Sequence, residues 1–114
     1  MKLEDFKNKL KSTPQEIEFS ETMAVIEANY EFSPTAFKNG KLSNAAGENS
    51  GSCKLFAFAK KQEFSKEEAL ACFGAFYFED VLKNPNENGH QNIRNFIKTD
   101  FAGLEFEGEA LLEK

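Results

Sequence analysis

Phenylalanine supplies almost all of the aromatic material in this chain, and this single feature constrains the fold most. Thirteen of the 114 residues are Phe, whereas two are Tyr and none is Trp. Large aromatic side chains dominate the burial of a protein core, so most of these rings must be enclosed together. With 40% hydrophobic residues in all, a chain of this length can bury one core, and we assign residues 1–114 to a single domain.

The widest apolar stripe predicts a helix that begins after Ser65 and ends at Asn84. Ser65 and Glu68 have the spacing of a capping box, in which each side chain satisfies a backbone N–H of the first turn. A stripe as wide as the one that follows is typical of a helix packed against a core. Its expected members are Leu70, Phe73, Tyr77 and Val81, widened by Ala69, Cys72 and Phe76.

Helical spacing of apolar residues predicts further helices elsewhere. We expect them over residues 3–11, from Phe19 onward with Tyr30 on the same face, from about Ser52 to Lys61, and over residues 91–99. Thr13 before Pro14, and Ser20, are expected helix caps. For residues 53–59 a buried strand remains an alternative, because periodicity does not separate a short buried helix from a strand.

Asn39-Gly40, flanked by Phe37 and Leu42, predicts a β-hairpin in which these two residues take the central positions of the turn. We therefore expect two antiparallel strands within residues 30–44. Alternation at residues 104–107 predicts an edge strand of the same sheet. The predicted fold class is α+β, with four or five helices packed on a small antiparallel sheet that contains the hairpin.

Charge and composition exclude several classes of protein. The net charge is −5 and Arg94 is the one arginine, which disfavours nucleic-acid binding because that requires cationic side chains to replace counterions. No apolar stretch approaches the 18 or so residues of a membrane span, and residues 1–12 lack the apolar segment of a signal peptide. We expect a cytoplasmic protein whose Cys53 and Cys72 are buried free thiols, with a pairing of the two as the alternative.

The familiar catalytic motifs are absent from the sequence. It contains no CxxC, HExxH, GxSxG, GxGxxG or phosphate-loop pattern. With one His and two distant Cys, we predict no metal site and no cofactor. These absences favour a protein that is not an enzyme, although they leave that question open.

A loop rich in Gly and Ser, residues 47–54, runs into a predicted helix. Backbone N–H groups at a helix N-terminus can bind an anion, and Lys54 lies nearby in sequence. Cys53 at the same place could be an activated nucleophile, and a pair with His90 is conceivable. The structural alternatives are a flexible connection, a helix cap and an inert buried thiol.

A second polar block, residues 90–95, precedes and begins the predicted helix at 91–99. His90 could act as a general base, and Arg94 could hold a carboxylate or phosphate. The structural alternative is that His90 caps the helix while Arg94 binds a surface carboxylate. From these blocks we predict seven ligand-binding residues: Asn29, Asn44, Ser52, Lys54, His90, Asn92 and Arg94.

Four segments of the chain resemble the HopJ type III effector family in the same order and spacing. They are residues 22–40, 51–59, 71–74 and 90–96. The resemblance extends from Phe6 to Leu111 and identifies the predicted domain as HopJ-like. It implies a bacterial protein related to one that a type III secretion system injects into plant cells, and it brings no assigned activity or catalytic residues. Related chains in bacteria that are not plant pathogens imply a resident cytoplasmic role.

Three functional hypotheses follow. The first is a non-enzymatic binding or regulatory protein of the bacterial cytoplasm, with an unidentified protein or small-molecule partner and an exposed apolar patch. The second is a small-anion-binding protein or enzyme that uses the His90/Arg94 region and the loop at residues 47–54, which requires these groups to share one pocket. The third is a secreted effector that acts on a host protein.

Overall fold

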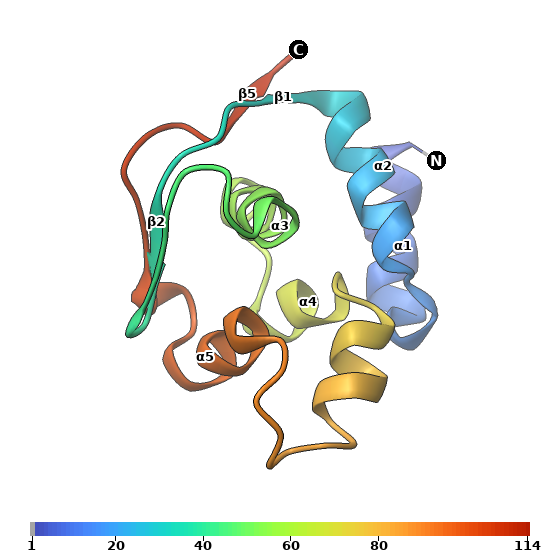
Figure 1. Cartoon of the computed structure of the whole chain (residues 1–114). Coiled ribbons are helices and arrows are strands. Elements are labelled where there is room, and N and C mark those ends of the chain that lie inside the picture. Colours follow the sequence, from blue (N-terminus) through green and yellow to red (C-terminus); the bar gives the residue numbers. More distant parts are fainter. Residues whose placement is uncertain (1) are drawn as a thin grey trace.

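Helix α3 (Ser50–Lys61) lies at the centre of the fold. The computed structural model describes residues 2–114, and in Figure 1 the other elements form a ring around α3. Five consecutive side chains of this helix, from Leu55 to Ala59, are buried. A helix that is apolar on nearly every side must be enclosed on nearly every side. The helical prediction for residues 53–59 is therefore confirmed, and the strand alternative is wrong.

Four further α-helices pack around α3. They are α1 (Leu3–Ser12), α2 (Phe19–Asn29), α4 (Lys66–Ala71) and α5 (Gln91–Thr99). Two short 3-10 turns, η1 (Pro14–Glu16) and η3 (Phe101–Gly103), and a π-helical segment, η2 (Phe76–Val81), complete the helical part. Within residues 2–114, none of these helices is long and apolar enough to cross a membrane.

The strands form two small antiparallel sheets. Strands β3 (Leu42–Asn44), β2 (Phe37–Asn39) and β4 (Leu104–Phe106) make one sheet in that order. Strands β1 (Tyr30–Phe32) and β5 (Leu111–Glu113) make the other. The α+β class, the hairpin and the edge strand at residues 104–106 are thus confirmed. The expectation of a single sheet is wrong, because the first strand pairs with β5, which the sequence did not reveal.

The hairpin turn differs from the prediction by one residue. Asn39 pairs with Leu42 across the ladder, so Gly40 and Lys41 occupy the turn. Gly40 has a φ of +62°, the conformation that glycine adopts most readily. Asn39 is instead a fully buried strand residue, which gives its side chain a role in packing described below.

The helix expected from Ser65 to Asn84 is interrupted at Gly74. Both hydrogen bonds of the Ser65–Glu68 capping box are present, as predicted. However, α4 ends at Ala71, Gly74 takes a φ of +61°, and the chain continues as η2 in a new direction. Phe73 is buried, whereas Phe76 is 39% exposed. The expected place of Phe76 in the core stripe is therefore wrong.

The capping predictions for the segment before α2 also need correction. The Thr13 side chain does not cap the segment that follows it, and that segment is one turn of 3-10 helix, η1. Glu18 and Glu21, not Ser20, form the capping box of α2. Tyr30 leaves the helical face to begin β1, although it remains buried as expected.

Phenylalanine rings fill the core, as the composition requires. Phe56 of α3 contacts rings from three other elements, at centroid distances of 6.5 Å to Phe37, 5.4 Å to Phe73 and 4.8 Å to Phe96. These partners come from β2, the turn after α4, and α5. The buried residues form one hydrophobic cluster. The predicted domain boundary reaches Met1, which lies outside the described residues.

Candidate functional site

Two helix N-termini meet at one pocket. The first residues of α3 and of α5 line a hollow of about 430 Å³, to which α3 contributes Gly51 and Ser52 and α5 contributes Gln91, Asn92 and Ile93. We call this hollow the N-terminal pocket. The first N–H groups of a helix have no carbonyl partner within the helix and carry a partial positive charge. The pocket therefore has two such donor groups at its edge.

The two helices begin in the same unusual way. Asn49 precedes α3 with φ and ψ of 49° and 47°, and His90 precedes α5 with 55° and 50°. Both residues are in the left-handed region, whereas the residue that precedes a helix is ordinarily extended. Neither side chain caps its helix, so the structural alternative in which His90 caps α5 is wrong. The side chains of Asn49 and His90 therefore leave the first N–H groups of α3 and α5 without a cap.

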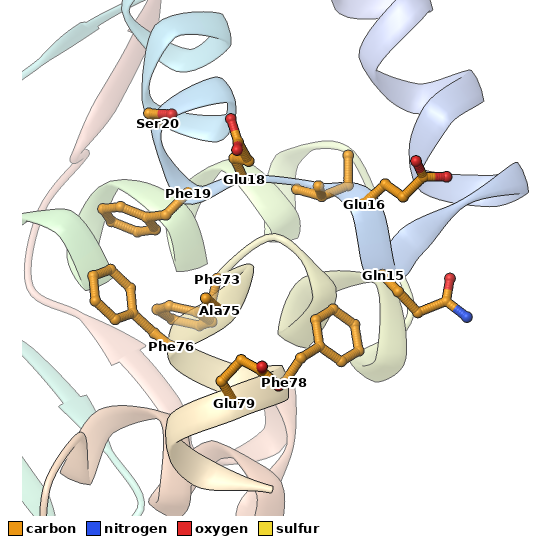
Figure 2. Close-up of a pocket in the computed structure, with 11 residues that line it drawn as sticks. Gln15, Glu16, Glu18, Phe19, Ser20, Phe73, Ala75, Phe76, Phe78 and Glu79 are labelled. Carbon is orange, nitrogen blue, oxygen red and sulfur yellow. The ribbon is translucent and has the colours of Figure 1, made fainter. Parts of the chain in front are cut away.

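An aromatic wall closes one side of the N-terminal pocket. It consists of Phe19, Phe73 and Phe76. Phe19 stacks on Phe73 at 6.2 Å and meets Phe76 edge-on at 5.2 Å, and Figure 2 shows the three rings clustered together. Gly51 permits this arrangement, because a Cβ on Gly51 would lie 3.0 Å from Phe19 Cζ.

His90 is held at the edge of the pocket by two contacts. Its Nε2 lies 3.1 Å from Asp80 Oδ2, and its ring lies 5.2 Å from that of Phe76. Asp80 belongs to η2, so the π-helical segment positions both partners of the imidazole. The contact of Nε2 with Asp80 orients the imidazole ring, so that the other ring nitrogen, Nδ1, points away from Asp80.

Hydrogen bonds among asparagines hold together the elements that line the N-terminal pocket. Asn39 Nδ2 donates to the Asn92 backbone carbonyl at 2.7 Å, and Asn92 Nδ2 donates to Asn44 Oδ1 at 3.1 Å. Asn49 Nδ2 donates to the same Asn44 oxygen at 2.7 Å. These bonds join β2, β3, the residue before α3, and α5. They fix the two helix N-termini relative to each other.

The predicted ligand-binding residues separate into two groups. Ser52, His90 and Asn92 share the N-terminal pocket, and Asn44 supports it through Asn92. The second hypothesis required the His90/Arg94 region and the loop at residues 47–54 to share one pocket. Asn49, Gly51 and Ser52 of that loop line the pocket with His90, but Arg94 does not.

Lys54 and Asn29, two of the remaining three predicted residues, make contacts away from the N-terminal pocket. Lys54 lies 3.5 Å from Glu27 Oε1 and over the ring of Phe32. Asn29 donates to the carbonyl of Val25 within its own helix.

Arg94 lies outside the N-terminal pocket, although it was expected there. Its Nε donates to the Gly89 carbonyl, and the residue lines a separate hollow of about 480 Å³ together with Lys98. The expected contact of Arg94 with a surface carboxylate is therefore replaced by one with a backbone oxygen.

The cysteines are free thiols and both are buried, so the pairing alternative is wrong. Cys53 Sγ faces the Thr35 carbonyl at 3.9 Å, and Cys53 is not among the residues that line the pocket with His90. Burial raises the pKa of Cys53, which is the opposite of an activated thiol. The proposed Cys53–His90 pair has no support.

Sequence reasoning missed four residues that shape the site: Phe19, Asn39, Phe76 and Asp80. Phe19 and Phe76 were assigned to core-facing helical stripes, and Asn39 to the centre of a turn. The signal that could have identified Phe76 is Gly74, since a glycine within a helical pattern lowers the expectation that the helix continues. Asp80 carries no such signal. Within residues 2–114, no group of three or more His, Cys, Asp or Glu could hold a metal ion.

Comparison with known proteins identifies the family. A sequence profile described as HopJ type III effector protein matches residues 3–111. The chain belongs to the HopJ type III effector protein family. The resemblance seen in the sequence is therefore confirmed over nearly the whole chain.

The HopJ fold also matches a solved structure of a protein of unknown function, VPA0580. The two chains are 55% identical, with a TM-score of 0.98, and the match covers 100% of this chain and 95% of that chain. A search of curated proteins found no match. The comparisons establish the HopJ family and the fold, and the site must supply the argument for function.

Proposed function

We propose that this HopJ protein is a non-enzymatic binding protein that holds a small anionic ligand with a planar apolar part in the N-terminal pocket. The observation that carries the proposal is the meeting of two helix N-termini, neither capped by a side chain, in front of an aromatic wall. A phosphate or carboxylate group suits the N–H groups. A ring suits the faces of Phe19 and Phe76.

The lining of the N-terminal pocket carries no carboxylate that would repel an anion, although the chain as a whole is acidic. None of the residues that line the N-terminal pocket is Asp or Glu, whereas the net charge of the chain is −5. The Ser52 hydroxyl and the His90 imidazole add hydrogen-bonding groups of the required kind. Each helix terminus contributes about 0.3–1 kcal/mol to binding an anion at an exposed site.

A binding role accounts for the geometry better than a hydrolytic one. Asp80, His90 and Ser52 have the residue types of a catalytic triad, and a triad requires a hydrogen bond between nucleophile and base. No such bond joins Ser52 to His90 in the described part of the chain. The aromatic wall and helix termini need no catalytic relay to hold a ligand.

The test is an NMR titration with phenyl phosphate and, as a control, with phenol. We expect phenyl phosphate to shift the backbone amides of Gly51, Ser52, Asn92 and Ile93, with a dissociation constant on the order of 1 mM or below. Phenol should shift them much less, because it lacks the anionic group. Shifts centred on Arg94 and Lys98 would assign the anion to the other hollow and overturn the proposal.

A charge variant makes this test specific. Ser52→Asp places a carboxylate in the pocket, where it takes the place of the ligand anion, and an acidic side chain in the first turn of a helix does not harm folding. We expect Ser52→Asp to abolish the phenyl phosphate shifts. Ser33→Asp adds the same charge at an exposed position outside the pocket and should leave them unchanged. Equal binding by both variants contradicts the proposal.

We also infer that the protein acts in the bacterial cytoplasm, with delivery into a host cell as the alternative. Two buried free thiols suit a reducing compartment, whereas the family description supports an effector role. Immunoblotting of the culture medium and the cell lysate, in bacteria with and without an active type III secretion apparatus, tests this inference. Accumulation in the medium that depends on the apparatus contradicts a purely cytoplasmic role.

A further inference from the structure

A second hollow shares the aromatic wall and, unlike the N-terminal pocket, is lined by glutamates. It is a cleft of about 820 Å³ between residues 15–20, which run from η1 into the first turn of α2, and residues 73–79, which run from the turn after α4 into η2. We call it the acidic cleft. It shares Phe19, Phe73 and Phe76 with the N-terminal pocket, but its remaining lining residues are different.

Aromatic side chains form the floor of the acidic cleft along its length. Figure 2 shows Phe19, Phe73 and Phe76 grouped at one end and Phe78 at the other, beside Gln15. Phe76 is 39% exposed, and Phe78 is only partly buried. Phe76 and Phe78 therefore offer apolar surface that side chains of a partner can cover.

Carboxylates stand on both sides of this floor. Glu16 and Glu18 belong to the segment before α2, where Glu18 also caps that helix, and Glu79 belongs to η2 on the opposite side. No Lys or Arg is among the residues that line the cleft. The combination of aromatic faces with carboxylates favours cationic groups, through both ion pairing and cation–π contacts.

Lys83 already contacts one of these carboxylates. Its Nζ lies 2.8 Å from Glu79 Oε2, and both side chains are more than half exposed. Exposed pairs of this spacing on a helix are weak. A cationic side chain from a partner can therefore replace Lys83 at little cost.

We propose that the acidic cleft binds a basic, apolar segment of a partner protein, in which Lys or Arg alternates with large apolar residues. The carboxylates lie on opposite sides of an open hollow, so a chain that places cations on both sides satisfies more of them than one small cation does. Apolar side chains of the segment would cover Phe76 and Phe78. The proposal is independent of anion binding in the N-terminal pocket.

The test is a fluorescence anisotropy titration of the full-length protein with two labelled peptides. In the first, Lys and Arg alternate with Leu and Phe; in the second, Glu replaces every basic residue. We expect the basic peptide to bind and the acidic peptide not to bind. The affinity of the basic peptide should decrease as salt is added, since exposed charges are screened.

Variants with opposite expected effects distinguish the acidic cleft from a general attraction to an acidic protein. Glu16→Gln combined with Glu79→Gln should weaken the basic peptide about tenfold, at about threefold for each carboxylate. Lys83→Gln removes the competing cation and should strengthen binding. Any Lys→Gln substitution makes the net charge more negative by one unit, so the control must be a lysine far from the cleft. Lys41→Gln, at the exposed turn of the β2–β3 hairpin, is the matched control and should have little effect.

The apolar part of the interaction needs its own variant. Phe78→Ala removes a ring that lines the acidic cleft but not the N-terminal pocket, so it should weaken the peptide and leave phenyl phosphate binding unchanged. Circular dichroism establishes that each variant is folded. The proposal is overturned if both peptides bind equally, if Lys83→Gln and Lys41→Gln have the same effect, or if a small alkylammonium ion competes fully with the peptide at the cleft.

Discussion

A methyl group on Gly74 would lie 2.8 Å from the carbonyl oxygen of Ile17, a separation that real Cβ atoms do not reach. The same Cβ would lie 2.9 Å from the backbone nitrogen of Phe19. Gly74 therefore allows the turn after α4 to pack directly on the segment before α2. This contact brings Phe73 and Phe19 together in the wall shared by the N-terminal pocket and the acidic cleft.

We predict that Gly74→Ala destabilises the protein by about 2–4 kcal/mol, because a positive φ disfavours Ala and the new methyl group meets backbone atoms that cannot move aside. The measurement is urea unfolding followed by circular dichroism.

Alanine variants of two other glycines separate the effect of backbone strain from that of the close contact. Gly47 has a φ of +90° with nothing within 4 Å of a Cβ, and Gly89 is equally open without a positive φ. Gly47→Ala should cost about 1–2 kcal/mol from backbone strain alone, and Gly89→Ala should be nearly neutral. If Gly74→Ala costs no more than Gly47→Ala, the close contact with Ile17 does not constrain the fold.

The interruption at Gly74 also shows what local patterns can predict. The Ser65–Glu68 capping box was identified correctly because all of its atoms lie within one turn of the chain. The end of α4 depends on Ile17 and Phe19, which are far away in sequence, and the apolar stripe continues through Gly74 without a change. Periodicity therefore predicted one helix where the structure has two segments.

Asn92 is the centre of the buried asparagine cluster, and we predict that Asn92→Ala destabilises the protein by about 2–3 kcal/mol. The substitution removes the acceptor of Asn39 Nδ2 and Asn44 Nδ2 and the donor to Asn44 Oδ1. Asn39 Nδ2, Asn44 Nδ2 and Asn44 Oδ1 each keep one other partner, so the loss is that of three hydrogen bonds at about 0.5–1.5 kcal/mol each. Thermal unfolding and urea titration measure the loss.

A matched position on the same helix provides the control. Asn95 donates from its side chain only to the Gln91 carbonyl within α5, in an exposed hydrogen bond. Asn95→Ala should change the free energy of unfolding by less than about 0.5 kcal/mol. Equal losses for Asn92→Ala and Asn95→Ala would show that the asparagine cluster contributes no more than a surface bond.

The candidate site was predicted in part, for a physical reason. Ser52, His90 and Asn92 were identified because polar residues at the start of a helix are recognisable from sequence. Their convergence was not predictable, because it depends on Asn39, Asn44 and Asn49 joining α3 to α5 through side chains. Arg94 was misplaced because a helical position does not specify which neighbour a long side chain reaches. Lys54 turned toward Glu27 for the same reason.

The two thiols predict a loss of stability in mildly alkaline solution. Desolvation by burial, reinforced by the charge of Glu68, raises the pKa of Cys72 despite a hydrogen bond with Thr22, and burial raises the pKa of Cys53. An unfolded thiol ionises near pH 8.5, whereas the folded thiols stay neutral to higher pH. Stability is therefore fully present below about pH 8.5 and decreases as the pH rises above it, because only the unfolded state releases the protons.

For Cys72 the expected decrease approaches about 1.4 kcal/mol per pH unit once the unfolded thiol is ionised, and Cys53 adds to it in the same direction. Urea unfolding at pH 7.5, 8.5 and 9.5 measures it, in a range below the ordinary ionisation of Lys and Tyr. The double variant Cys53→Ala/Cys72→Ala should be less stable at pH 7.5 but should lose most of the alkaline decrease.

Iodoacetamide should label neither thiol of the folded protein at pH 8 within the time that labels both in urea. Rapid labelling of Cys72 in the folded protein, or an unchanged alkaline decrease in the double variant, would show that burial does not hold these thiols neutral.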